Sequence, residues 1–146
     1  MLIHAEGARV EFARSRTEPA SPGDRKSGIT DVALFVRVVA RLVTCELTRV
    51  WFDRGEWRSF VDRLGEPLPA GHSIRLASRV FGAVPVCPRL TLVVGPEDGE
   101  GRVAVSARVE ATHAHDGVFA EGELSADFTV EPGVLRSAAL GLAALR

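Results

Sequence analysis

The chain has 146 residues, the size of one ordinary domain; 46% are hydrophobic and 25% are charged. Its formal net charge of −1 excludes the strongly basic composition that is typical of nucleic-acid-binding domains. No stretch approaches the roughly 18 to 20 apolar residues of a membrane-spanning helix, and residues 1–20 lack the basic start and apolar run of a signal peptide. We therefore expect a single domain, 1–146, in the cytoplasm, without nucleic-acid or membrane partners.

The N-terminal residues predict a short β-hairpin. Strands at Leu2–His4 and Arg9–Ala13 flank a turn at Glu6-Gly7, and Val10 and Phe12 share one face of the second strand. The following segment, about 14–29, reads as a loop, because residues 14–28 hold two prolines and two glycines but no large apolar side chain. Such a segment has nothing to bury, so we expect a mobile polar loop within the same domain.

Residues 30–52 predict extended structure. The segment is dense in β-branched residues, and Val32, Leu34, Val36 and Val38 alternate as on one buried face of a sheet. The apolar phase shifts near Ala40-Arg41, which predicts either one strand with a bulge or bend, or two strands.

The next segment, about 53–65, predicts a helix. Asp53 is suited to the N-cap, and Glu56 three residues later completes a capping box. Phe52 and Trp57 are spaced to form a hydrophobic staple, and Gly65 is placed to end the helix in the left-handed conformation. The apolar stripe of this helix would consist of Trp57, Phe60, Val61 and Leu64.

Strands dominate the second half of the chain. Extended segments are expected at Ser73–Val80, Val84–Pro88 and Arg89–Val94. Arg102–Ala111 and Val118–Val130 then alternate apolar with polar residues, which is typical of an antiparallel pair with one buried and one solvated face.

A second helix, about 132–146, is expected to begin at Pro132, since proline suits the first turn of a helix. The predicted order of elements gives an α+β fold. It consists of an antiparallel meander with two helices, one central (about 53–65) and one C-terminal, packed on one face.

The predicted loop between the last two strands carries residues of metal-ligand type. On an extended segment, His113 and His115 point the same way, and Asp116 offers a third ligand. A closed zinc site needs four ligands, and Asp116-Gly117 is also a typical hairpin turn, so we favour the turn over a metal site.

Acidic residues gather in the same part of the chain. Residues 97–131 hold nine acids and two arginines. Glu110, Glu121, Glu123 and Asp127 are expected on the polar faces of the last two strands, where an acidic surface would attract a basic protein partner. A sheet face that is merely kept soluble by its charges is the alternative.

The two arginines in this region predict cross-strand ion pairs. If the hairpin closes around 113–117, Arg108 lies opposite Glu121 or Glu123, and Arg102 lies near Asp127 or Thr129. Such exposed pairs contribute about 0.2 to 1 kcal/mol each.

Three stretches of sequence, WFDRGEWRSFVDRL, GEGRVAVSARV and EPGVLRSAALGLAAL, carry a resemblance to WapI-type immunity proteins and related bacterial domains. It covers nearly the whole chain, except that the polar stretch at 14–28 and the segment at 84–88 depart from it. The resemblance implies a cytoplasmic protein that binds and neutralises a toxin without a cofactor. It transfers no functional residue, because its matching stretches are core patterns.

The sequence contains no phosphate-binding glycine loop, no nucleophile elbow and no His-Glu-x-x-His motif. We therefore predict a protein-binding module without catalytic residues or cofactors, in the specific form of an immunity protein. A small-ligand or metal-binding domain and a self-assembling structural protein are the alternatives, and the sequence leaves the oligomeric state open.

Overall fold

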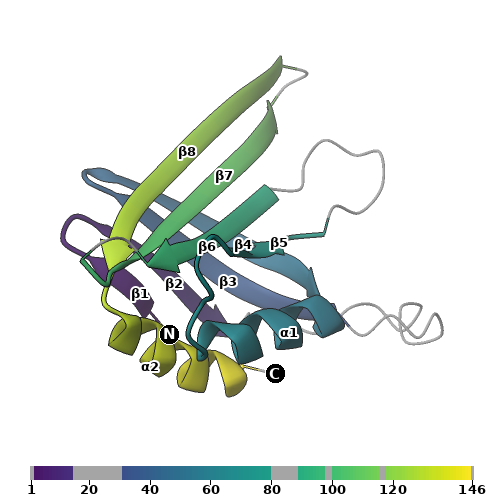
Figure 1. Ribbon diagram of the computed structural model, residues 1–146. Helices are drawn as coiled ribbons and strands as arrows, with labels where there is room; N and C mark the ends of the chain where they lie inside the picture. Colours follow the sequence, from purple (N-terminus) through teal and green to yellow (C-terminus); the bar gives the residue numbers. More distant parts are fainter. Residues whose placement is uncertain (1, 15–30, 80–88, 98–99, 116–117, 146) are drawn as a thin grey trace.

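The computed structural model describes residues 2–14, 31–79, 89–97, 100–115 and 118–145. These residues form two four-stranded antiparallel sheets, each in sequence order, and two helices (Figure 1). The elements are β1 (Leu2–Ala5), β2 (Ala8–Arg14), β3 (Asp31–Ala40), β4 (Val43–Asp53), α1 (Arg54–Leu64), β5 (Ile74–Ala77), β6 (Arg89–Glu97), β7 (Val103–His115), β8 (Val118–Val130) and α2 (Pro132–Ala143). The predicted α+β class with antiparallel pairing is confirmed; the strands divide into two sheets, β1–β4 and β5–β8, rather than forming one.

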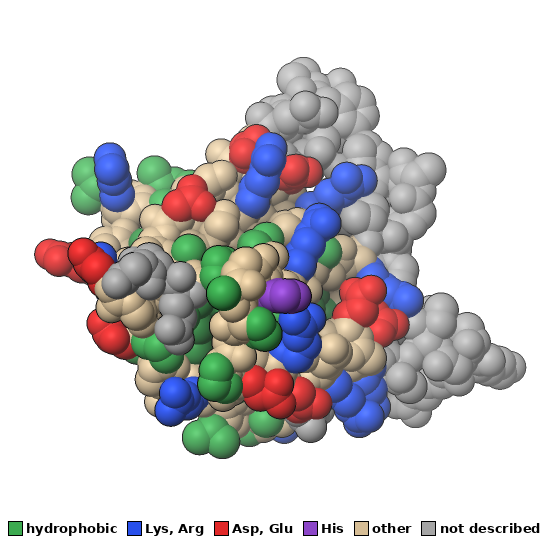
Figure 2. Space-filling view, in the orientation of Figure 1, with side chains coloured by type: hydrophobic (Ala, Val, Ile, Leu, Met, Phe, Trp, Pro, Cys, Tyr) green, Lys and Arg blue, Asp and Glu red, His purple; other side chains and the backbone are tan. Residues whose placement is uncertain are grey.

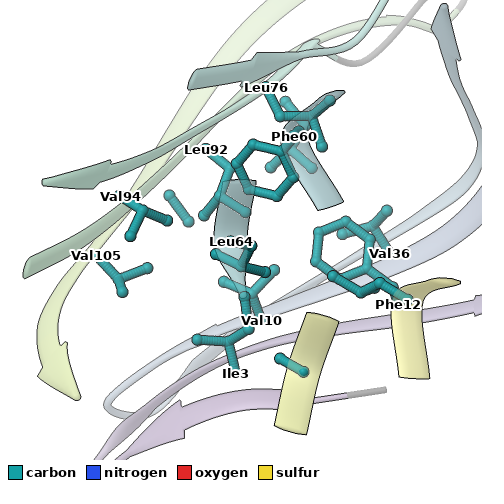
Figure 3. Packing of buried hydrophobic residues seen from close by; sticks show 14 of the residues in the cluster. Ile3, Val10, Phe12, Val36, Phe60, Leu64, Leu76, Leu92, Val94 and Val105 are labelled. Atoms are coloured by element: carbon teal, nitrogen blue, oxygen red, sulfur yellow. The ribbon is translucent and has the colours of Figure 1, made fainter. Parts of the chain in front are cut away.

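One hydrophobic core lies between the two sheets and the helices (Figure 3). Side chains of the first sheet, such as Phe12 and Val36, face side chains of the second sheet, such as Leu92 and Val105. The helices α1 and α2 lie side by side and complete the core, α1 against β5 and α2 against β1 (Figure 1). Trp57 on α1 is fully buried, with its ring centroid 5.8 Å from that of Phe12.

The segment 30–52 contains two strands, the second of the two predicted possibilities. A tight turn at Arg41-Leu42 joins β3 to β4, and Arg41 adopts a left-handed backbone with φ of 54°. The pairing of β3 with β4 is also irregular between Leu34 and Val36. The phase shift in the sequence therefore marks a reversal of the chain.

The start of α1 agrees with the sequence prediction in its N-cap residue, whereas the reciprocal bond of a capping box, from the Asp53 N–H to the Glu56 side chain, is not formed among the described residues. The Asp53 carboxylate accepts hydrogen bonds from the backbone N–H groups of Gly55 (2.8 Å) and Glu56 (3.0 Å). The rings of Phe52 and Trp57 lie 5.4 Å apart, as a hydrophobic staple requires.

The predicted end of this helix is wrong in its conformation. Gly65 has φ of −81° and ψ of −11°, which are ordinary right-handed values. The Glu66 N–H donates to the Arg63 carbonyl (3.2 Å), so a tightened last turn satisfies a terminal carbonyl without a left-handed residue.

The alternation predicted for the last two strands is confirmed where their side chains are described, at 103–110 and 122–130. Val103, Val105, Ala107 and Val109 of β7 are buried, and their neighbours point outward. The α2 helix begins at Pro132 as expected, and buries Leu135, Ala138, Ala139 and Leu142. Arg14 belongs to β2, whereas the rest of the predicted polar loop and the predicted strand at 84–88 lie outside the described residues.

Candidate functional site

The outward face of β7 and β8 carries three of the four predicted acidic residues. In the register of this strand pair, Glu110 lies opposite Glu123, and Asp127 lies opposite Ser106. All three acids are exposed, because the neighbouring positions of each strand point into the core. The fold therefore brings these three carboxylates to one side of one sheet.

Arg108 holds the two opposed glutamates together. Its guanidinium contacts Glu123 twice, with Nε 2.9 Å from Oε1 and Nη2 2.9 Å from Oε2. Nε also lies 3.3 Å from Oε1 of Glu110. One cation is thus shared between two carboxylates, and each of the three side chains is about half exposed.

The ion pair between Arg108 and Glu123 agrees with the sequence prediction, although its geometry is diagonal. The backbone partner of Arg108 is Ser125, and the side chain reaches along β8 to Glu123. The cross-strand ion pair expected between Arg102 and Asp127 does not form. Arg102 precedes β7 and pairs with Glu100, because both residues belong to the turn before the strand.

The remaining predicted acid, Glu121, lies on β8 with Thr112 as its backbone partner, and its side chain lies outside the described residues. Asp127 makes no ion pair with any residue that the structure describes. Around it, small side chains cover the outward positions of the two strands. They are Ala104, Ser106, Ser125 and Thr129.

The sequence reasoning missed the arginines that share this face of the sheet. Arg89 of β6 lies opposite Glu110, and Arg75 of β5 points to the same side. The described outward face is therefore basic toward β5 and acidic toward β8. In Figure 2 arginine and carboxylate side chains are interspersed over the visible face of the molecule. The alternation of Arg89, Thr91 and Val93 was the available signal for this arrangement.

Known proteins provide no template for this surface, since comparisons with protein-family models, curated proteins and solved structures found no match. Within the described ranges, no helix is long and apolar enough to cross a membrane.

The predicted metal ligands are only partly placed. His113 and His115 occupy alternate positions at the end of β7, opposite Ala120 and Val118. Their side chains and all of Asp116 lie outside the described residues. Among the residues that are described, no group of three or more His, Cys, Asp or Glu side chains gathers. The metal site stays an untested alternative to the hairpin turn that the sequence favours.

An open groove of about 560 Å³ runs between α1 and β5. Phe60 and Ile74 line its apolar part, and both are almost fully buried. Glu56, Arg63 and Arg75 supply charged side chains of both signs to the same groove. The buried side chains of Phe60 and Ile74 therefore form the floor of this groove, which is shallow.

Proposed function

We propose that the chain is a protein-binding module and that its partner presents basic side chains to the acidic surface of β7 and β8. We define this surface by Glu110, Glu123 and Asp127 and include Glu121 of the same strand. The resemblance to WapI-type immunity proteins supports a specific form of this function, in which the partner is a toxin that is neutralised when the chain covers it.

The observation that carries the proposal is the direct opposition of Glu110 and Glu123. Like charges that face each other across a strand pair destabilise a sheet. Arg108 relieves this repulsion only in part, since one positive charge serves two negative ones. A lysine or arginine from a partner would supply the second positive charge, so binding relieves a repulsion that the free protein retains.

The surroundings of the carboxylates also favour a protein partner. The small outward side chains Ser106, Ser125 and Thr129 leave this part of the sheet flat. A flat, charged surface allows another protein to approach closely, and charge complementarity accelerates the first encounter. We therefore expect partner binding to slow as the salt concentration rises.

The experiment compares three forms of the chain as bait in lysate from cells that express it. These are the wild type, the double variant Glu123→Gln/Asp127→Asn, and a control, Glu6→Gln/Glu66→Gln, which removes two exposed acids elsewhere. Quantitative mass spectrometry with isotope-labelled peptides identifies the proteins that the wild type and the control retain at equal levels and that the β8 variant loses. If no protein shows this pattern although all three baits are folded, the proposal is wrong.

A second measurement tests the toxin-neutralising form of the function. The captured partner is expressed in bacteria together with each form of the chain. We expect the wild type and the control to restore growth, and the β8 variant to restore it less. A partner whose expression leaves growth unchanged would refute the immunity role while retaining the binding role.

A further inference from the structure

Two turns meet at one end of the first sheet, away from the acidic surface. The Arg41 N–H, in the turn between β3 and β4, donates to the Gly7 carbonyl in the turn between β1 and β2 (2.6 Å). Beside these turns the surface opens into a hollow of about 350 Å³. Its lining combines Arg9 and Arg41, which are cationic, and His4 with the apolar residues Leu2 and Val39.

His4 and the two arginines come from three segments that the sheet places next to one another. His4 of β1 lies opposite Arg9 of β2, and Arg9 lies opposite Val39 of β3. These residues point outward, because the neighbouring positions, such as Ile3 and Val10, are buried in the core. No carboxylate lines the hollow.

Arg37, on the same sheet, shows what an arginine with neighbouring carboxylates looks like. On the same face of the sheet, Arg37 lies between two carboxylates, 3.3 Å from Glu11 and 2.6 Å from Glu46. Arg9 and Arg41 form no ion pair with any described residue. The positive charges of Arg9 and Arg41 thus lie in one hollow without the neighbouring carboxylates that Arg37 has.

Besides this charge repulsion, the backbone of Arg41 is itself in an unfavourable conformation. Its φ of 54° lies in the left-handed region, where glycine or asparagine is the usual residue. The turn therefore uses an arginine where a glycine would avoid both the backbone strain and the repulsion from Arg9.

We propose that this hollow binds a phosphate monoester through Arg9 and Arg41, with His4 at its edge. Guanidinium groups match phosphate oxygens with paired hydrogen bonds, and the doubly negative phosphate compensates the gathered positive charges. The volume falls in the usual range of small-molecule sites. Leu2 and Val39 provide an apolar wall for the organic part of the ligand. This site is separate from the acidic surface and does not depend on the proposed protein partner.

The same chemistry has a second source, the headgroup of a lipid with a terminal phosphate. Leu42 follows Arg41 and is fully exposed, and Val43 is 55% exposed. Exposed apolar side chains beside a phosphate site would enter a membrane surface if the ligand were a lipid. A soluble monoester would bind without contact to Leu42.

The first arm of the test is a calorimetric titration of the full chain with inorganic phosphate and with glycerol 3-phosphate. Nitrogen-15 spectra of the arginine Nε–H groups report the site in parallel. We expect the signals of Arg9 and Arg41 to shift on binding. Arg9→Gln and Arg41→Gln should each weaken binding about two- to fivefold, as exposed ion pairs do, and Arg41→Lys should weaken it less. The control Arg89→Gln removes an exposed arginine from the other sheet and should leave affinity unchanged.

The second arm measures sedimentation of the chain with vesicles of phosphatidylcholine, with and without phosphatidic acid. A soluble ligand predicts phosphate binding that Leu42→Ser leaves unchanged and no retention on vesicles. A lipid ligand predicts retention that depends on phosphatidic acid, Leu42 and the two arginines. The proposal is overturned if neither arm shows binding, or if the binding seen in either arm survives undiminished in the folded variant Arg9→Gln/Arg41→Gln.

Discussion

The guanidinium of Arg79 lies 3.2 Å from the carboxylate of Asp53, at the point where the two sheets come together. The Arg79 N–H also donates to the carbonyl of Trp51 on β4 (2.7 Å). The preceding residue, Ser78, donates its N–H to Leu90 of β6 (2.8 Å). Two consecutive residues thus connect the second sheet to the edge of the first.

Asp53 is the residue whose removal should test this junction. Hydrogen bonds from the Glu56 N–H and then the Gly55 N–H lower its pKa below the ordinary 3.8, as does the positive charge of Arg79, although loss of hydration acts in the opposite direction. A lowered pKa means that the stabilisation is complete above the ordinary value and is lost as the pH falls through the lowered one.

We therefore expect Asp53→Ala to unfold at lower urea concentration than the wild type at pH 7. The difference in free energy of unfolding should be constant down to about pH 5 and shrink below about pH 4. Urea titrations at several pH values measure it, with Glu66→Gln as a control whose effect stays small. A difference that does not change with pH would contradict the assignment.

Trp57→Ala should lower the free energy of unfolding by about 3 to 5 kcal/mol, because it leaves a large cavity in the core. Trp57→Phe should have less than half of this effect. The Nε1 donor of Trp57 is buried and has no hydrogen-bond partner among the described residues, so its removal offsets part of the lost packing. Urea unfolding followed by circular dichroism compares the variants. Equal effects of both substitutions would show that Nε1 has a partner.

Gly65→Ala should be neutral or stabilising, by up to about 1 kcal/mol, because φ is already helical and the added methyl meets Ala139 Cβ at an ordinary 3.5 Å. Gly101→Ala should instead destabilise by about 1 to 2 kcal/mol, since its φ of 76° is left-handed. Thermal unfolding of the two variants measures the contrast. Destabilisation by Gly65→Ala of the same size would support the left-handed helix end that the sequence predicted.

Arg108→Ala should lower the free energy of unfolding by about 0.5 to 1 kcal/mol, because it leaves Glu110 and Glu123 facing each other without a shared cation. Adding Glu123→Gln to this variant should restore much of the loss. A double-mutant cycle from urea titrations at low salt measures the coupling, which should decrease in high salt. Additive effects of the two substitutions would show that the repulsion is absent.

Local patterns predicted the parts of the fold that depend on neighbouring residues. Asp53 and Trp57 marked the start of α1 because capping and the staple involve residues within one turn. The alternation of apolar and polar residues from Val103 to Val109 predicted β7, because only one face of this strand is buried. The ion pair between Arg108 and Glu123 was also predictable, since it depends only on the register of one hairpin.

Relationships between distant segments were not predictable in this way. The residues of β4 and β5 do not reveal that these strands belong to separate sheets. The hydrogen bond from Arg79 to Trp51 depends on how the two sheets pack, which local patterns do not determine. The approach of Arg89 to Glu110 likewise needs the register between β6 and β7. His4, Arg9 and Arg41 looked unrelated because the hollow they line arises only when two turns meet.

Each sheet pairs only strands that follow one another along the chain. Every ladder therefore closes a loop between sequence neighbours, and loop closure of this kind carries a small entropy loss. The contacts of β8 with β1 and the hydrogen bond from Arg14 to the Ala144 carbonyl join opposite ends of the sequence. We expect the ladders of each sheet to form early and locally, with the closing of the single core between the two sheets as the slow, rate-limiting event.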